Sequence, residues 1–209
     1  MKITKFAHAC VLLEDNGKVV LIDPGNFAWE AGQIKPADWP KVDEIAVTHG
    51  HGDHFHPPFV EALHQAFPDA TWVAPEEVAA KLTEMGITKV SATGTDLIKV
   101  SPVQHERMPM GTPPQNIQVD VFGKFTHPGD SHQSTVTMAV MGMPFVSPWG
   151  SMTAGSDVVL KLKPKKVVPV HDALWTDGAK QWMYGMLRDY YKEQGIELII
   201  PVEGEPFEV

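Results

Sequence analysis

Hydrophobic and polar positions fall into short runs along the chain, and most of these runs predict strands. Residues 3–13 and 18–23 are predicted as two strands joined at Asp15-Asn16-Gly17, where the Asn-Gly pair favours a tight hairpin turn. Residues 44–48 predict a short buried strand. Further strands are expected over residues 70–74, 87–91, 97–103, 117–125, 135–141, 166–170 and 197–201.

Apolar residues at helical spacing predict helices between these strands. The first helix has one apolar face, made of Phe59, Val60, Leu63 and Phe67. The second spans 76–85, and a short one is expected near 156–162. A longer helix over 177–193 has a predicted inward face of Ala179, Trp182, Met183, Met186, Leu187 and Tyr190. Strands alternating with helices indicate an α/β sandwich, in which helices cover the faces of sheets.

The composition is that of an ordinary globular chain. Of the 209 residues 43% are hydrophobic and 21% are charged, so we expect one domain over residues 1–209 and exclude disorder. The net charge of -9 opposes binding to nucleic acid. No apolar run approaches the roughly 20 residues of a membrane span, and the single Cys10 fits a reducing compartment. We expect a cytoplasmic protein with a small-molecule substrate and no nucleic-acid or membrane partner; the sequence leaves open whether it forms a homo-oligomer.

Histidines carry the candidate chemistry. The segment Thr48-His49-Gly50-His51-Gly52-Asp53-His54 places four metal-binding side chains within six residues. Imidazole nitrogens and carboxylate oxygens suit zinc and other divalent metals. A tight loop can direct the first two histidines to one metal and Asp53 with His54 to a second. The alternative is a histidine-rich surface turn, but the segment follows an apolar strand rather than a polar tract.

Further metal ligands are expected downstream, because one loop cannot complete two metal sites. His105, Asp130 and His171 lie at the ends of predicted strands, where they can converge over a common cleft. Asp23 also ends a strand, and it either orients a ligand histidine by accepting its N–H or simply caps a loop.

Taken in order, these residues resemble the metallo-β-lactamase superfamily. The loop matches the His-x-His-x-Asp-His motif of that family, and His105, Asp130 and His171 match its third histidine, bridging aspartate and last histidine. The resemblance covers nearly the whole chain. It is closest to the branch of hydrolases similar to L-ascorbate-6-phosphate lactonase, on the segments Ala7-His8-Ala9, Thr126-His127-Pro128-Gly129-Asp130-Ser131 and Pro148-Trp149-Gly150. Ala7, Thr126 and Ser131 depart from the pattern of that branch and leave the substrate open.

The resemblance implies a four-layer αβ/βα sandwich, with two mixed sheets, helices on the outer faces and two divalent metal ions at one edge. The first metal would be held by His49, His51 and His105, and the second by Asp53, His54 and His171. Asp130 would bridge them, and zinc is expected first, with manganese or iron as alternatives. The implied activity uses a metal-bridged hydroxide to cleave a lactone, another ester or amide, or a phosphodiester.

The same resemblance gives the two aspartates, Asp53 and Asp130, a catalytic role, and places His8 and His127 near the metals as cleft residues rather than ligands. A non-catalytic or redox member of the fold that binds metal and a small molecule is the alternative. The complete ligand set argues against a non-catalytic scaffold. Neither a flavin domain nor a reduced ligand set, one of which a redox role requires, is visible in the sequence.

Arginine is scarce, with only Arg107 and Arg188 in the chain. Arg107 lies two residues after His105, at the start of a loop rich in proline and methionine. A guanidinium there can anchor a phosphate or carboxylate of the substrate; the alternative is a solvated arginine. Residues 24–40 form a second long loop, with aromatic rings that suggest a lid or a flap.

Overall fold

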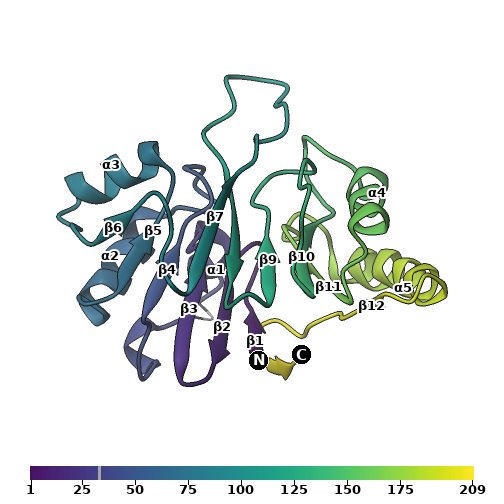
Figure 1. Cartoon of the computed structure of the whole chain (residues 1–209), viewed down its shortest axis with the longest axis horizontal. Helices are drawn as coiled ribbons and strands as arrows, with labels where there is room; N and C mark the ends of the chain where they lie inside the picture. Colours follow the sequence, from purple (N-terminus) through teal and green to yellow (C-terminus); the bar gives the residue numbers. More distant parts are fainter. Residues whose placement is uncertain (33) are drawn as a thin grey trace.

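The computed structural model describes residues 1–32 and 34–209. It consists of two facing β-sheets with helices on their outer faces (Figure 1). Within these residues the first sheet has the strand order β13 (Pro206–Glu208), β1 (Lys2–Lys5), β2 (Val11–Asp15), β3 (Lys18–Ile22), β4 (Glu44–Ala46), β5 (Thr71–Val73) and β6 (Val90–Ser91). The second has the order β12 (Glu197–Leu198), β11 (Lys166–Val170), β10 (Val140–Pro144), β9 (Phe125–His127), β8 (Ile117–Val121) and β7 (Ile98–Pro102).

The helices complete four layers. In Figure 1, α2 and α3 lie on the left of the paired sheets and α4 and α5 on the right, while Ala28 of α1 belongs to the same buried cluster as α2 and α3. They are α1 (Asn26–Glu30), the 3-10 helix η1 (Pro36–Asp38), α2 (Pro57–Ala66), α3 (Glu76–Glu84), α4 (Met152–Leu162) and α5 (Asp177–Glu193). Both sheets mix parallel and antiparallel pairs; β3 pairs antiparallel with β2 and parallel with β4, for example. The expected αβ/βα sandwich is therefore confirmed.

Side-chain alternation along the strands assigns residues to these layers. Leu13 and Val20 point between the two sheets, where they share a buried cluster with Val119 of β8. Leu12 and Leu21 point the other way, into the cluster that contains the apolar faces of α2 and α3. Because both faces of the central strands are buried, their sequences are nearly continuous apolar runs.

Several predicted elements differ from the structure in extent. The strand over 3–13 is broken by a loop at residues 6–10, in which His8 takes a left-handed φ of 64°. The strand over 117–125 is divided into β8 and β9 by a turn with positive φ at Phe122 and Gly123. The strand expected from 135 begins at 140, and α4 begins at 152 rather than 156. The sequence pattern missed α1 and β13.

The predicted inward face of α5 is partly wrong. Trp182 is 67% exposed, and Met186 and Tyr190 are 44% and 46% exposed. The buried stripe is formed by Tyr184, Leu187 and Tyr191. The helix carries two apolar stripes at similar spacing, and only packing against the second sheet decides which one is buried.

A network of ion pairs joins β1 and α5 to Asp172, two residues after β11, and to Glu203, between β12 and β13. Lys5 Nζ lies 2.8 Å from Asp172 Oδ1 and 3.4 Å from Glu203 Oε1, and its side chain is 1% exposed. The hydroxyl of Tyr184 donates to the second Asp172 oxygen, and Lys180 pairs with Glu203 at 2.9 Å. Since Asp172 follows His171, this network fixes the backbone next to a candidate metal ligand.

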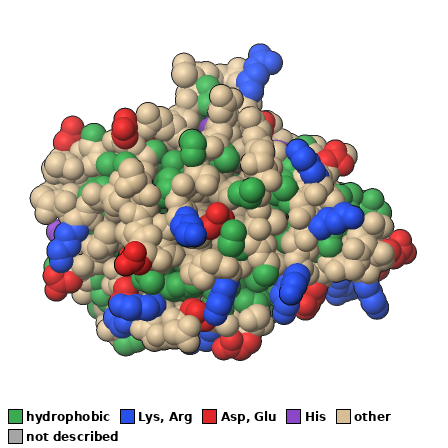
Figure 2. All heavy atoms as spheres, viewed as in Figure 1, with side chains coloured by type: hydrophobic (Ala, Val, Ile, Leu, Met, Phe, Trp, Pro, Cys, Tyr) green, Lys and Arg blue, Asp and Glu red, His purple; other side chains and the backbone are tan. Residues whose placement is uncertain are grey.

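Charged side chains are spread over the surface. On the face drawn in Figure 2, lysines and arginines are interspersed with acidic side chains. Among the described residues, no helix combines the length and hydropathy required to cross a bilayer.

Candidate metal centre

The candidate ligands gather at one edge of the sandwich, where four strands end. The histidine loop follows β4, and His105, Asp130 and His171 follow β7, β9 and β11. Their ligand atoms form two groups, with all atoms of each group within 4.8 Å of one another. One group is His49, His51, His105 and Asp130, and the other is His8, Asp53, His54 and His171. The structure therefore brings together all the side chains that the sequence nominates as ligands.

Three of the histidines are oriented by hydrogen bonds on the side away from this centre. His54 Nδ1 lies 2.7 Å from Asp23 Oδ2, and His105 Nδ1 lies 2.7 Å from the backbone carbonyl of the next residue. His171 Nδ1 contacts the carbonyl of Val146. In the neutral imidazole, an Nδ1–H that donates leaves the lone pair on Nε2, the tautomer that binds a metal.

Buried polar atoms at the centre have no hydrogen-bond partner. Within the described part of the chain, this holds for Nε2 of His54, His105 and His171 and for Oδ1 of Asp130. The histidine nitrogens lie within ion-pair distance of Asp130 but without hydrogen-bond geometry, so their lone pairs and that of Oδ1 are available to a ligand. Divalent cations would satisfy all four, so the donor set fits metals.

Asp130 reaches both groups. Its Oδ1 lies 3.1 Å from His54 Nε2, and its Oδ2 lies 3.2 Å from His171 Nε2 and 3.4 Å from His105 Nε2. Burial alone would raise the pKa of this carboxyl, but His54 and His171 outweigh burial and hold the pKa well below its usual range. Burial likewise opposes protonation of His171, yet Asp130 raises its pKa to about 9. The carboxylates thus favour positive charge where cations would lie.

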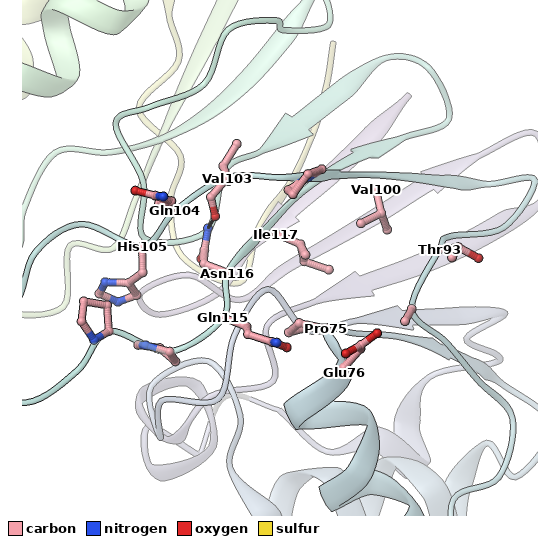
Figure 3. A pocket seen from close by; sticks show the side chains of 14 residues that line it. Pro75, Glu76, Thr93, Val100, Val103, Gln104, His105, Gln115, Asn116 and Ile117 are labelled. Atoms are coloured by element: carbon pink, nitrogen blue, oxygen red, sulfur yellow. Dashed lines mark hydrogen bonds between the residues drawn. The ribbon is translucent and has the colours of Figure 1, made fainter.

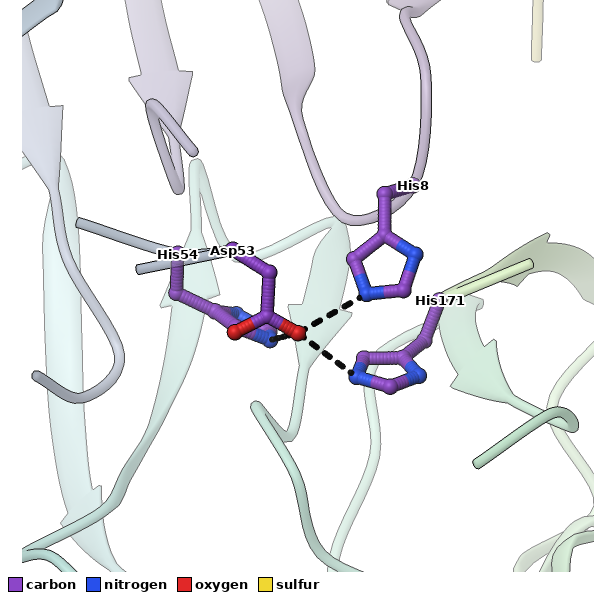
Figure 4. Close-up of side chains that lie close together, drawn as sticks. All are labelled: His8, Asp53, His54 and His171. Carbon is purple, nitrogen blue, oxygen red and sulfur yellow. Dashed lines mark hydrogen bonds and ion pairs between the residues drawn. The ribbon is translucent and has the colours of Figure 1, made fainter. Parts of the chain in front are cut away.

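His8 acts as a donor in this arrangement. The backbone N–H of Ala173 donates to His8 Nδ1 at 3.2 Å, so the proton of the neutral ring resides on Nε2. Nε2 lies 3.1 Å from Asp53 Oδ2 (Figure 4). Burial lowers the pKa of His8 to about 4, which keeps the ring neutral. His8 therefore holds the Asp53 carboxylate by a hydrogen bond, and its expected place beside the metals without being a ligand stays a prediction.

Asp23 anchors the start of the histidine loop. Its carboxylate accepts the backbone N–H of Thr48 at 2.7 Å and the Thr48 hydroxyl at 2.8 Å, besides contacting His54. Asp23 is fully buried and has a left-handed φ of 51°. This position corresponds to the expected acceptor role rather than to a loop cap.

A close approach between two loops requires glycine at residue 25. A Cβ on Gly25 would lie 1.7 Å from the backbone oxygen of Asp53, whereas Gly52 has open space around its Cα. Neither Gly50 nor Gly52 has a positive φ in the described structure. Glycine is therefore required at residue 25, which faces the histidine loop, whereas Gly52 within that loop could accept a Cβ.

Two residues at the site were missed in the sequence. The indole N–H of Trp149 donates to Asp130, and Asn116 accepts the backbone N–H of Asp130 at 3.1 Å while donating to the Pro128 carbonyl. Trp149 belongs to a segment that matched the lactonase-like branch, and this match was the available signal. Asn116 carries no comparable signal.

The remaining candidates lie at different depths. His127 is fully buried, and its Nδ1 accepts the N–H of Gly129 while lying 4.0 Å from Asp23. Arg107 is exposed in the segment between β7 and β8, two residues after His105. Its expected role as an anion anchor remains a prediction.

Comparison with known proteins agrees with this geometry. The family model described as a beta-lactamase superfamily domain matches residues 2–171. A UPF0173 protein of Pyrococcus furiosus is 27% identical over 221 residues, covering 95% of this chain and 100% of its own. A UPF0173 metal-dependent hydrolase of Bacillus thuringiensis is 39% identical over 87 residues, covering 42% of this chain and 37% of its own.

A solved structure shows the same fold. Igni18, a metallo hydrolase from the archaeon Ignicoccus hospitalis, superimposes with a TM-score of 0.68 at 19% identity, covering 100% of this chain and 98% of its own. The family match spans the strands that bear every candidate ligand, and the ligand atoms converge in two groups. The chain therefore belongs to the beta-lactamase superfamily, and its described residues form two candidate metal sites.

Proposed function

We propose that the chain binds two divalent metal ions and hydrolyses a lactone, another ester or amide, or a phosphodiester in a small molecule. The observation that carries this proposal is the convergence of buried Nε2 and carboxylate atoms that have no hydrogen-bond partner among the described residues. The proposed ligands are His49, His51 and His105 for the first metal, Asp53, His54 and His171 for the second, and Asp130 for both.

Zinc is the metal we expect first, with manganese and iron as alternatives, since histidine and aspartate serve all three. When bound, two such cations lower the pKa of a water to near 7 and polarise the bond under attack. The chain supplies the orientation: Asp23 fixes the His54 ring, and the Nε2–H of His8 fixes the Asp53 carboxylate.

Within these bond types we place lactones first. This choice rests on the segments that resemble the lactonase-like branch, two of which contact the ligands. His8 of the first segment donates to Asp53, and Trp149 of the third donates to Asp130. Both contacts concern the metal ligands and leave the rest of the substrate open.

The test combines metal analysis with a substrate panel. The protein is loaded with zinc, manganese or iron(II), and metal content is measured beside the hydrolysis of chromogenic lactones, esters and phosphodiesters. We expect about two metals per chain and chelator-sensitive hydrolysis of at least one class. A saturated value of one metal contradicts the binuclear centre. Two metals without hydrolysis of any class favour the non-catalytic or redox alternative.

Variants assign the ligands. His51→Ala is expected to lose metal and activity together, whereas His64→Ala, in α2 and outside both ligand groups, keeps both. Asp130→Asn is expected to weaken at least one metal and to lower turnover by at least about 100-fold, since an amide cannot neutralise two cations. Normal metal content and turnover in Asp130→Asn would contradict its bridging role.

A further inference from the structure

An open cavity of about 940 Å³ adjoins the metal centre (Figure 3). It lies between the beginning of α3, strand β7 and the segment that leads into β8. His105 is part of its wall, while Nε2 of the same ring belongs to the first group of ligand atoms. His105 therefore lies at the boundary between this cavity and the metal centre, and it is the one candidate ligand among the described residues that line the cavity.

The walls of the cavity are mainly apolar and rigid. Val100, Val103 and Ile117 supply aliphatic side chains, and four prolines contribute their rings. Proline has a fixed φ, so these walls need little ordering when a ligand binds. The loop above the cavity is uncharged from Met108 to Asn116, and Met110 within it is 81% exposed.

The charge of the cavity disfavours anions. Within the described chain its lining includes one carboxylate, from Glu76, and neither a lysine nor an arginine. Of the three amide side chains in the lining, Asn116 is already engaged with the backbone near Asp130, Gln115 accepts the N–H of Glu77, and Gln104 is exposed and carries no charge. A carboxylate or phosphate placed here would meet Glu76 without a cationic partner.

We propose that this cavity binds an uncharged, apolar acyl or alkyl group of the substrate. The proposal rests on the proposed hydrolase function and narrows it to esters or lactones with an aliphatic chain beside the bond that is cleaved. A cavity of this size is in the range of sites for small organic ligands. Selectivity then comes from burial of methylene groups rather than from an ion pair.

The test compares p-nitrophenyl acetate with p-nitrophenyl octanoate on the metal-loaded protein. Thr93→Trp places a large ring on the cavity wall at an exposed position, and Thr88→Trp makes the same change at an exposed position outside the cavity. Burial of only two methylenes corresponds to about tenfold, so we expect kcat/KM for octanoate to exceed that for acetate by at least about tenfold. Thr93→Trp should remove this preference and leave acetate within about twofold, whereas Thr88→Trp should behave as wild type.

Binding of 2-decanone, an uncharged chain that cannot be hydrolysed, gives a second readout by calorimetry. We expect binding to the wild type and to Thr88→Trp and its loss in Thr93→Trp. If neither ester is hydrolysed but 2-decanone binds in this pattern, the cavity proposal stands and ester hydrolysis fails. Equal kcat/KM for both esters, equal effects of the two tryptophan variants, or no binding of 2-decanone would overturn the cavity proposal.

Discussion

The indole N–H of Trp149 donates to Oδ2 of Asp130 at 2.9 Å. The ring centroid of Trp149 lies 5.9 Å from that of His105 and 5.4 Å from that of His171. The indole therefore holds the carboxylate that reaches both ligand groups, and it also covers two of the histidines. Trp149 lies in the connection between β10 and α4, so this connection belongs to the metal centre although it supplies none of the proposed ligands.

Replacing this indole by a ring without an N–H should weaken metal binding. A hydrogen bond to a charged group contributes about 1.5–3 kcal/mol, so Trp149→Phe is expected to lower metal affinity by about tenfold or more. Competition with a chromophoric chelator measures this affinity. Trp182→Phe, at an exposed position on α5, is the matched control. Equal affinities of the two variants would show that the hydrogen bond does not position Asp130.

Gly25→Ala should displace the histidine loop, since the new Cβ would overlap the backbone oxygen of Asp53. We expect a loss of about 1–3 kcal/mol in the free energy of unfolding, the usual cost of overpacking, together with reduced metal content. Denaturant unfolding and elemental analysis measure the two effects. Gly52→Ala adds its methyl group to open space and should retain both properties. If the two variants behave alike, the contact at Gly25 has no special importance.

Arg107 lies outside the apolar cavity, at an exposed position near His105. If it anchors an anionic substrate group, Arg107→Ala should raise KM for an anionic ester by about tenfold, as a lost hydrogen bond between charged groups predicts. The neutral analogue of the same ester should be nearly unaffected. The test is to measure KM for both esters with the wild type and the variant. An equal rise in KM for both esters, or no rise for either, would identify Arg107 as a surface residue.

Glu203 should stabilise the fold in a pH-dependent way. Burial opposes its ionisation, but Lys5 and Lys180 outweigh burial and lower the pKa of the carboxyl. A lowered folded pKa gives stabilisation that is full above the unfolded pKa of about 4.3 and is lost as pH falls through the folded value. Glu203→Gln is thus expected to be less stable than wild type at pH 7, with a difference that shrinks below about pH 4. Urea unfolding at a series of pH values measures it, with the exposed Glu205→Gln as control. A difference independent of pH would contradict this ionic role.

Much of the fold could be predicted because both faces of the central strands are buried, which leaves long apolar runs in the sequence. The same property concealed the break between β1 and β2. Residues 6–10 are buried although they form a loop, so their composition resembles that of a strand. The prediction of which face of α5 is buried failed for a related reason. Trp182 and Tyr184 belong to two apolar stripes of the helix, and only packing against the second sheet determines which stripe is buried.

The candidate ligands could be predicted more completely than the bounds of the strands and helices, because the ligands cluster in one loop and at strand ends. The residues that orient them are harder to find. Asn116 and Trp149 contact Asp130 across 14 and 19 positions of sequence, through contacts that no local pattern encodes. The proton position on His8 likewise depends on Ala173, which lies 165 positions further along the chain.

The histidine loop follows a strand of the first sheet, whereas His105, Asp130 and His171 follow strands of the second. Neither half of the chain alone holds a complete set of ligands, so the centre forms only after the two sheets have packed against each other. Metal binding is thereby thermodynamically linked to the docking of the halves, and free metal stabilises the native state by RT ln(1 + [L]/Kd). The same linkage implies that removal of free metal with a chelator would lower the temperature at which the two sheets separate.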